Sequence, residues 1–257
     1  MGNVDNGNKI LNEVLAIARK GKMIEEEIES KYLNETMTLK LYLPENFSSL
    51  YKYHICIMQD GNDYYQLGRV ATVSDKLHTN EEIENTVFVG IHYLDRYDRK
   101  EKYHPSGEQQ QAYIKFLVNE AVPLLDEIVP TYHMGQSRAL VGDSLAGTLA
   151  LMTAVKYPHT FSKVIMQSPY VDEDVLSTVK NAKNIHGIDI YHTIGENETA
   201  VDTTDGSEVD FVTPNRELHD LLQAKGVSYQ YHELEAGEHT WKYWQKDLPH
   251  ALTAMLN

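Results

Sequence analysis

Ser144 stands at the centre of a short motif that suits a catalytic nucleophile. Residues 142–147 read GDSLAG and follow the spacing G-x-S-x-G, with Ala146 at the position of the last glycine. A nucleophilic serine projects from a cramped strand-to-helix turn, so small residues are needed two positions to either side. Roughly a third of chains this long contain such a spacing by chance, given ordinary composition. The apolar segment before the motif (139–141) and the helical one after it (148–152) supply the required context, and we predict a nucleophile.

A serine hydroxyl needs a general base, usually a histidine held by a carboxylate. The chain has 12 histidines. Where a serine occupies this kind of turn, the base follows the last strand of the sheet, in the chain order serine, acid, histidine. His239 lies in the loop after the last strand-like segment, Val227–Leu234, whereas His232 falls inside that segment and His250 lies near the end of the final helix. We therefore predict that His239 is the base.

The acid that orients His239 is expected in the loop after the preceding strand, Ile188–Ile194. That loop is rich in carboxylates: Glu196, Glu198, Asp202, Asp205, Glu208 and Asp210. Most of them are expected to be solvated surface charges. Glu198 follows the strand closely enough to be held rigidly, so we predict that it is the acid, ahead of Glu196 and Asp202.

An oxyanion hole needs two backbone N–H groups directed at the developing negative charge. Leu145, the residue after the nucleophile, is expected to supply one of them. The turn after the strand His54–Gln59 is expected to supply the second, where Gly61 permits close backbone approach and Asn62 is a candidate donor. An ordinary polar turn is the alternative for this segment.

Several polar and aromatic side chains are candidates for substrate binding. Arg96 and Arg99 follow the strand Thr86–His92 and should lie near the carboxyl edge of the sheet, where they could bind an acyl group or form a structural ion-pair cluster. Tyr64 lies in the turn after the first parallel strand. Trp241 begins the last helix, where it either packs the helix or lines the pocket.

No spacing in the chain indicates a metal or a cofactor. The histidines are scattered, and no H-E-x-x-H, paired-cysteine or P-loop pattern occurs. Cys56 is the one cysteine, and its place inside an apolar segment indicates a buried strand residue rather than a nucleophile. We expect chemistry carried by side chains and backbone alone.

The elements that must position these residues follow from the hydrophobic pattern. Residues Lys9–Lys20 have helical spacing, and alternation between Met23 and Leu43 predicts an antiparallel hairpin. Short strands then alternate with helices. The predicted strands are His54–Gln59, Thr86–His92, Arg138–Gly142, Lys163–Gln167, Ile188–Ile194 and Val227–Leu234. The predicted helices are Tyr65–His78, Glu108–Ile128, Ala146–Tyr157, Asp174–Ala182, Asn215–Lys225 and Trp241–Leu256. This order predicts an α/β-hydrolase fold, with a mostly parallel sheet of about eight strands and helices on both faces.

The whole-chain properties limit the class of partner. The 257 residues carry a net charge of −15, which disfavours nucleic acid and anionic lipid and suits a small neutral or cationic substrate. No apolar run is long enough to span a bilayer, and the N-terminus lacks signal-peptide features, so we expect a cytoplasmic protein. We expect an extension at 1–22 and one domain at 23–257 with no separate lid, as a monomer or a homodimer.

Taken together, the motifs resemble the putative-esterase family of α/β-hydrolases. That family includes esterase D-like S-formylglutathione hydrolases, feruloyl and acetyl-xylan esterases, and enterochelin-type siderophore esterases. The resemblance rests on the stretches MQDGNDYY (58–65), VGDSLAG (141–147), KVIMQSPY (163–170), GENET (195–199) and GEHTWKYW (237–244). It implies Ser144 as nucleophile, Glu198 as acid and His239 as base. The family often has aspartate at the acid position, and Ala146 replaces the usual glycine.

The resulting hypothesis is a serine esterase that cleaves a small acyl or aryl ester through an acyl-enzyme on Ser144. Siderophore trilactone hydrolysis, acyl transfer to an alcohol and a catalytically inactive binding protein of the same fold are the alternatives. The sequence does not name the physiological ester.

Overall fold

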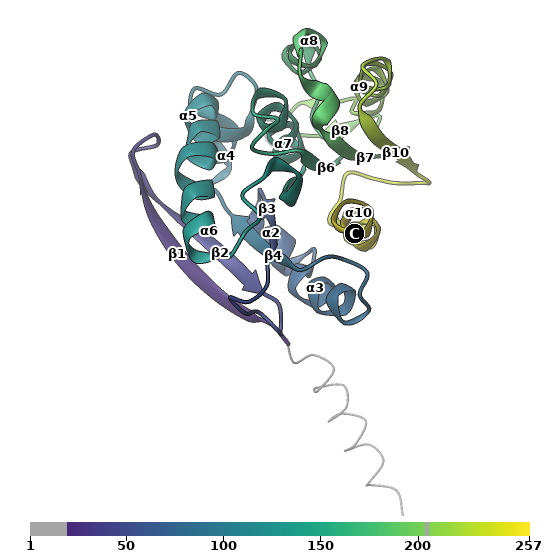
Figure 1. The fold of residues 1–257 in the computed structure, drawn as a ribbon. Coiled ribbons are helices and arrows are strands. Elements are labelled where there is room, and N and C mark those ends of the chain that lie inside the picture. Colours follow the sequence, from purple (N-terminus) through teal and green to yellow (C-terminus); the bar gives the residue numbers. More distant parts are fainter. Residues whose placement is uncertain (1–19, 204–205) are drawn as a thin grey trace, which may run out of the picture.

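An eight-stranded sheet runs through the computed structural model of the chain (Figure 1). The structure describes residues 20–203 and 206–257. The predicted helix Lys9–Lys20 and nearly all of the predicted extension 1–22 lie outside these residues.

The strand order is β1-β2-β4-β3-β5-β6-β7-β10. The strands are β1 (Lys22–Ser30), β2 (Glu35–Leu43), β3 (His54–Met58), β4 (Thr86–Ile91), β5 (Arg138–Asp143), β6 (Lys163–Gln167), β7 (Asp189–Gly195) and β10 (Ser228–Leu234). The hairpin β1–β2 joins β4 antiparallel, and every pair from β4 to β10 is parallel. The predicted fold class, a mostly parallel eight-stranded sheet with an N-terminal hairpin, is confirmed. In the parallel part, the carboxyl ends of the strands meet at one edge, where the predicted site residues belong.

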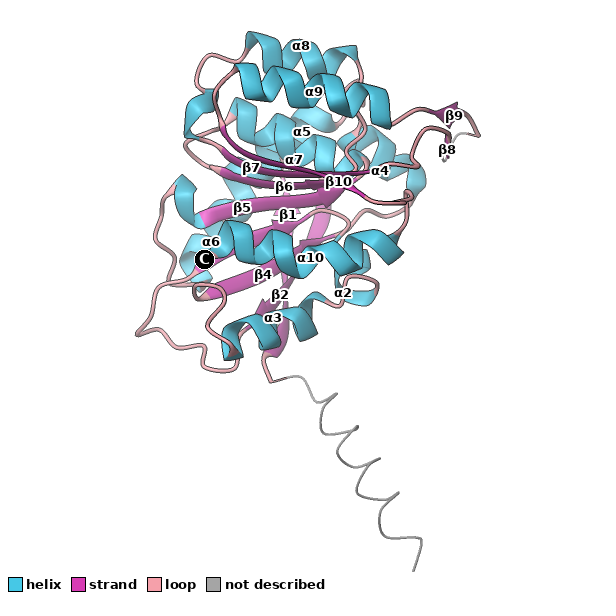
Figure 2. Ribbon diagram, turned by 90° about the vertical axis from the view of Figure 1, so that its right-hand side faces the viewer, coloured by secondary structure: helices cyan, strands magenta, loops and turns pink. Residues whose placement is uncertain are grey.

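Helices cover both faces of the sheet (Figure 2). One face carries α4 (Arg96–Tyr103), α5 (Gln110–Phe116), α6 (Val122–Ile128), α7 (Leu145–Lys156), α8 (Glu173–Asn181) and α9 (Val212–Ala224), and the other carries α2 (Gly61–Gln66), α3 (Val70–Thr79) and α10 (Trp241–Leu256). Because both faces are covered, the central strands are continuously apolar rather than alternating, as the sequence FVGI in β4 illustrates.

Two predicted helices are interrupted. The segment predicted as one helix at Tyr65–His78 forms α2 and α3, because Arg69 has a left-handed backbone with φ of 53°. The segment predicted at Glu108–Ile128 contains a π-helical turn, Leu117–Ala121, between α5 and α6. That turn places the Glu120 carboxylate where it accepts hydrogen bonds from the Ser30 hydroxyl at 2.6 Å and the Lys31 N–H at 2.9 Å, so the turn holds the hairpin against the helix.

The helix α4 was not predicted, although it forms one wall of the site. Asp95 caps its N-terminus, because the carboxylate accepts hydrogen bonds from the Tyr97 and Asp98 N–H groups. The buried Lys102 ammonium ties its other end to the hairpin through Glu35 at 2.5 Å and to Asp98 at 2.7 Å. Most residues of Arg96–Tyr103 are charged, so the segment lacks the apolar stripe that indicates a helix.

The acidic loop after β7 contains a second, two-stranded sheet that was also not predicted. Its strands are β8 (Val201–Asp202) and β9 (Glu208–Val209), and they pair with each other and not with the main sheet. Strands of this length are too short to produce a readable alternation of side chains. The hairpin projects beyond the carboxyl edge of the main sheet (Figure 2).

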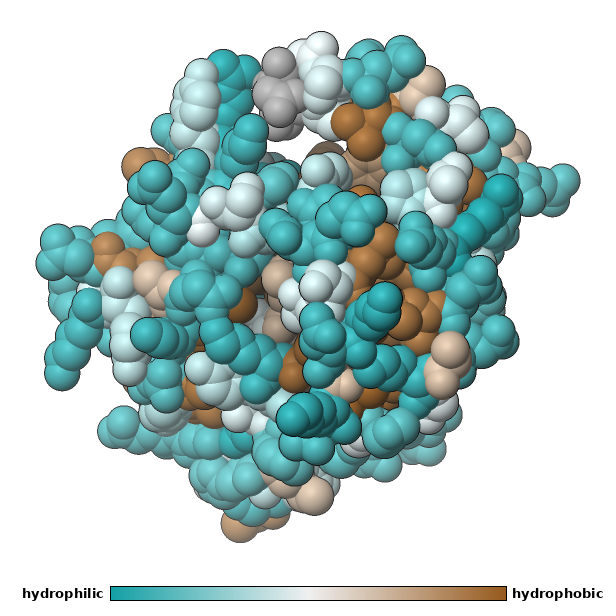
Figure 3. All heavy atoms as spheres, turned by 90° about the horizontal axis from the view of Figure 1, so that it is seen from above, coloured by the Kyte–Doolittle hydropathy of each residue, from teal (hydrophilic) through white to brown (hydrophobic). Residues whose placement is uncertain are grey.

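The face seen from above is mainly hydrophilic, with apolar residues showing only in small groups between polar ones (Figure 3). Such a surface agrees with a chain in which 24% of residues are charged. Within the described ranges, no helix combines the length and the apolar character needed to cross a bilayer.

Candidate active site

Ser144 occupies a strained turn between β5 and α7. Its backbone angles are φ 52° and ψ −126°, which are unfavourable for a residue with a Cβ atom. A Cβ on Gly142 would lie 2.2 Å from the carbonyl carbon of Ala146, and one on Gly147 would lie 2.9 Å from the Gly142 oxygen. The turn is therefore as tight as the sequence motif predicts, and its small residues are a steric requirement. The Ser144 N–H donates to the Gln167 carbonyl at 2.9 Å, which fixes the turn to β6.

The loops after β7 and β10 meet and bring Glu198 and His239 together. A Cβ on Gly237 would lie 2.7 Å from the Cα of Gly195, so the two backbones approach too closely for any side chain there. The Asn197 N–H donates to the Gly237 carbonyl at 2.9 Å across the same gap. His239 Nδ1 and Glu198 Oε2 are 2.6 Å apart, which is a short distance for a charge-assisted hydrogen bond.

Among the described carboxylates of the loop after β7, Glu198 is the one bonded to His239. Its side chain is 1% exposed, and the His239 side chain is 16% exposed. Glu196 and Asp202 are both exposed; Glu196 accepts a 3.3 Å hydrogen bond from the Ala236 N–H, and Asp202 lies in β8.

The second oxygen of Glu198 is held by groups that the sequence prediction missed. Oε1 accepts hydrogen bonds from the Ser168 hydroxyl at 2.6 Å and from the Gly195 N–H at 2.8 Å. Ser168 follows β6 and has a left-handed backbone with φ of 47°. The stretch KVIMQSPY contains this serine, but nothing in its spacing shows that the hydroxyl reaches a loop thirty residues later.

Ser144 and His239 line the same cavity, whose volume is about 280 Å³. The other residues that line it are Arg99, Lys100, His104, Asp143, Leu145, Tyr170, Val201, Asp202, Thr203, Ser207, Val209, Phe211 and Trp244. Helix α4 and the β8–β9 hairpin both contribute residues to its wall. The rings of Phe211 and Trp244 lie 4.4 and 4.9 Å from the His239 ring, so two aromatic side chains pack against the imidazole.

The predicted oxyanion residues are not all brought to this cavity. Leu145 lines it, at the N-terminus of α7, where backbone N–H groups have no intrahelical partner. Gly61 and Asn62 are absent from the described residues that line it. Gly61 packs on β4, because a Cβ there would lie 2.4 Å from the Gly90 Cα, and the Asn62 Oδ1 accepts a 2.9 Å hydrogen bond from the Lys40 ammonium.

The two arginines proposed for substrate binding differ in position. Arg99 lines the cavity, but its guanidinium is held by both oxygens of Asp60, with the shortest contact 2.6 Å, so the ion-pair reading applies. That pairing raises the pKa of Arg99 above its ordinary value despite burial. Arg96 is exposed and contacts the Tyr97 ring and hydroxyl. Neither guanidinium is therefore positioned as a ready binding group for an acyl carboxylate.

Next to Ser144, the Asp143 carboxyl lines the cavity in a buried position. Burial raises its pKa well above the ordinary value, and the negative charge of Asp60 adds to the effect. Within the described part of the chain, Asp143 Oδ1 has no hydrogen-bond partner.

Tyr64 and Trp241 were predicted to bind substrate, but neither is among the residues that line the cavity with Ser144 and His239. Tyr64 is fully buried, and its hydroxyl donates to Gln167 Oε1 at 3.2 Å. Trp241 packs edge-on against the Tyr64 ring at 4.8 Å and against Gly68. Three residues along α10, Trp244 instead points into the cavity, because residues three apart on a helix differ in direction by about 60°.

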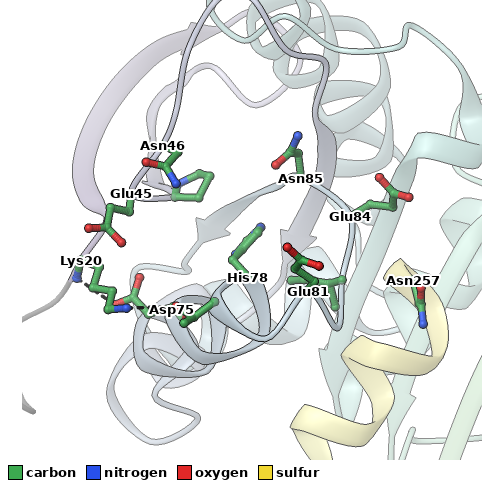
Figure 4. A pocket seen from close by; sticks show the side chains of 12 residues that line it. Lys20, Glu45, Asn46, Asp75, His78, Glu81, Glu84, Asn85 and Asn257 are labelled. Atoms are coloured by element: carbon green, nitrogen blue, oxygen red, sulfur yellow. Dashed lines mark hydrogen bonds between the residues drawn. The ribbon is translucent and has the colours of Figure 1, made fainter.

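A larger cavity, of about 600 Å³, lies at the opposite edge of the sheet (Figure 4). Its wall includes Lys20, Asp75, His78 and Glu84, with the C-terminal Asn257 nearby. Both ring nitrogens of His78 are engaged, Nδ1 with Ser74 and Nε2 with the Thr86 N–H at 3.1 Å. The smaller cavity is the one lined by both Ser144 and His239, and His239 is bonded to Glu198 behind it.

Behind the Glu198 loop lies a buried histidine that the sequence prediction did not single out. His192 Nε2 is 2.7 Å from Asn215 Oδ1, while the Asn215 amide donates to the carbonyls of Pro169 and Phe211 at 2.8 Å each. Because Asn215 Oδ1 can only accept, Nε2 carries the proton, and Nδ1 accepts from the Tyr229 hydroxyl at 2.8 Å. This network ties Phe211 and Pro169, the residue after Ser168, to His192 of β7 through Asn215.

We expect the neutral state of His192 to make the protein sensitive to acid. Burial lowers the pKa of His192 to about 3, below the value of about 6.5 in an unfolded chain. Its contribution to stability is therefore complete above pH ~6.5 and is lost as the pH falls toward 3, on the order of 5 kcal/mol in full. Urea unfolding at pH 7 and pH 4.5 should show a smaller loss of stability for His192→Gln than for the wild type. The exposed His186→Gln serves as control, and an equal loss in all three proteins would contradict the expectation.

Comparison with known proteins gives matches over nearly the whole chain. A family model described as Putative esterase matches residues 30–255. The uncharacterized protein YjcH of Bacillus subtilis (strain 168) is 47% identical over 238 residues, which is 93% of this chain and 99% of that protein. Among solved structures, a ferulic acid esterase superposes with a TM-score of 0.77 at 19% identity, covering 92% of this chain and 98% of its own.

The enterobactin esterase FES from Shigella flexneri, solved in the presence of enterobactin, superposes with a TM-score of 0.78 at 18% identity. The match covers 93% of this chain and 59% of that chain, so this protein spans little more than half of that enzyme's length. At these identities the solved structures establish the shared fold.

Proposed function

The chain belongs to the Putative esterase family, and from that premise we propose that it is a serine esterase acting through an acyl-enzyme on Ser144. Membership of the family supports ester hydrolysis in general. The observation that carries the finer proposal is the buried Glu198 carboxylate, 2.6 Å from Nδ1 of a histidine that shares a cavity with Ser144. Serine, imidazole and carboxylate in that relation are what nucleophilic acyl transfer requires.

In the proposed reaction, Ser144 Oγ attacks the ester carbonyl while His239 Nε2 accepts its proton. Glu198 keeps Nδ1 protonated and stabilises the imidazolium that forms. The carbonyl oxygen becomes an oxyanion facing the N–H of Leu145 at the start of α7. Collapse of the tetrahedral intermediate breaks the bond to the alcohol, which takes the proton from His239. Water then repeats the same steps on the acyl-enzyme and releases the acid.

The cavity supports a small or single-ring acyl group. Its volume of about 280 Å³ lies at the lower end of the range for small-molecule sites. Aromatic rings of Tyr170, Phe211 and Trp244 line it, and a flat acyl group packs well on such rings. We propose that the alcohol part of the ester extends out between α4 and the β8–β9 hairpin.

Hydrolysis of a siderophore trilactone is a second candidate, because solved relatives in fold are enterobactin esterases. The small cavity favours the first candidate. Initial rates on acetyl, aryl and trilactone esters at equal concentration would rank the two. A kcat/KM for the trilactone well above that for the aryl esters would reverse the order.

We expect a fluorophosphonate probe to form one covalent adduct, on Ser144. The probe phosphorylates an activated serine hydroxyl with loss of fluoride, whereas unactivated serines do not react at the same rate. Intact-mass measurement should show one added group, and peptide mapping should place it on the peptide that contains residues 142–147. Excess p-nitrophenyl acetate should slow the reaction. An adduct on another serine, or none, would contradict the proposed nucleophile.

A further inference from the structure

A buried chain of hydrogen bonds runs from the cavity wall to the Glu198 carboxylate. The Trp244 indole N–H donates to the Ser168 hydroxyl at 2.9 Å, and Ser168 donates to Glu198 Oε1 at 2.6 Å. Exposure is 4% for Trp244, and 0% and 1% for Ser168 and Glu198. Every member of the chain is therefore shielded from water, which makes each hydrogen bond costly to lose.

The direction of this chain is fixed by the donors available. An indole N–H can only donate, so Ser168 Oγ accepts from Trp244 and keeps one proton to give. That proton points to Glu198 Oε1, which as a carboxylate oxygen can only accept. Glu198 Oε2 is then left facing His239 Nδ1 at 2.6 Å. The order Trp244, Ser168, Glu198, His239 follows without any choice of rotamer.

Ser168 is held in place independently of Glu198. Its backbone N–H donates to the Thr193 carbonyl of β7 at 2.7 Å, and its φ of 47° turns the side chain toward the Glu198 loop. Trp244 is anchored in the same way, because the Gln167 amide donates to its carbonyl at 3.0 Å. The support is therefore built on β6, β7 and α10 rather than on the acidic loop itself.

A glutamate needs such support more than an aspartate would. It has one more side-chain torsion angle, and fixing that angle costs conformational entropy. The Gly195 N–H fixes Oε1 from the backbone side at 2.8 Å, and Ser168 fixes it from the other. Two donors on one oxygen define the plane of the carboxylate and hence the position of the oxygen that faces His239.

We propose that Ser168 and Trp244 are positioning residues that hold Glu198 in the orientation needed to direct His239. The proposal rests on the proposed serine esterase function. Trp244 also lines the cavity and packs edge-on against the His239 ring, with an interplanar angle of 87°. An acyl group bound on the indole therefore contacts the residue at which the chain of hydrogen bonds begins.

The test compares Ser168→Ala, Trp244→Phe and the double variant in p-nitrophenyl acetate hydrolysis from pH 5 to 9. Ser168→Ala should lower kcat about 10- to 100-fold with little change in KM, as for loss of a second-layer donor. The acidic limb of its pH–activity profile should also move to higher pH. The reason is that a Glu198 carboxylate with one donor fewer holds a proton, its own or the one shared with His239, more tightly. Trp244→Phe keeps an aromatic side chain but removes the N–H that donates to Ser168. It should cause a smaller loss of kcat and a shift of the pH profile in the same direction.

The double variant should have a kcat no lower than that of Ser168→Ala, because the Trp244 N–H acts through Ser168, whereas loss of the indole from the cavity wall should appear in KM. Tyr243→Phe, one residue away on α10, is the matched control and should keep the wild-type rate and pH profile. Wild-type kcat and pH profile in both Ser168→Ala and Trp244→Phe, or strictly additive losses, would overturn the positioning role. If wild-type turnover proves independent of Ser144, the proposed function fails instead, so the two failures are distinguishable.

Discussion

Ser144→Ala is expected to lower kcat/KM for p-nitrophenyl acetate by about 10⁴- to 10⁶-fold. In serine hydrolases, removal of the nucleophile leaves only the rate increase due to binding and oxyanion stabilisation. The substitution fits the turn, since Ala tolerates the backbone no worse than Ser, and the Ser144 N–H to the Gln167 carbonyl is retained. Thermal unfolding should therefore be close to that of the wild type. Initial rates at substrate concentrations well below KM give kcat/KM directly.

The exposed serine of α8, changed in Ser177→Ala, is the matched control and should retain full activity. A Ser144→Ala protein with wild-type turnover would end the proposal of an acyl-enzyme on this residue. That result would favour the alternative that the protein has the same fold but binds a ligand without catalysing a reaction.

Glu198→Gln is expected to lower kcat by about 10³- to 10⁴-fold, by analogy with loss of the acid in other triads. A glutamine has nearly the same shape, but its amide cannot hold the imidazolium and can donate toward His239, favouring the wrong tautomer. The same amide would face the Ser168 hydroxyl and the Gly195 N–H at Oε1, which it can satisfy with its carbonyl oxygen. The protein should therefore fold, and the defect should lie in kcat.

The neighbouring carboxylates provide the controls. Glu196→Gln and Asp202→Asn remove exposed charges of the same loop and should change kcat less than threefold, about the size of a surface effect. Asp202 lines the cavity, so a change confined to KM is compatible with its position. Loss of activity in Asp202→Asn equal to that in Glu198→Gln would mean that the orienting acid is not Glu198.

The fold could be predicted because its signals are local. Apolar segments of strand length, separated by amphipathic helices, specify a mostly parallel sheet, and the alternating segment at the start specifies the antiparallel hairpin. The interrupted helices were not predictable in the same way. Arg69 adopts a left-handed conformation, and the π turn at Leu117–Ala121 serves a contact between Glu120 and the hairpin. Both depend on tertiary contacts that a single-sequence pattern does not contain.

The positions of Ser144, Glu198 and His239 could be deduced because each follows the end of a strand. Binding residues could not, because the direction of a side chain depends on packing. Trp241 and Trp244 lie within one turn of α10, yet of these two side chains it is Trp244 that lines the cavity. Ser168 belonged to a recognised stretch, but its role depends on a 2.6 Å contact with Glu198 across the sheet edge.

The β8–β9 hairpin lies outside the main sheet but contributes residues to the wall of the cavity. Its strands pair with each other, and its ends are fixed where β7 stops and α9 begins. We expect a change in the length of this hairpin to leave the register of the main sheet and the turn that carries Ser144 in place. Grafting a hairpin of different length should therefore change the shape of the cavity more than the positions of Ser144, Glu198 and His239.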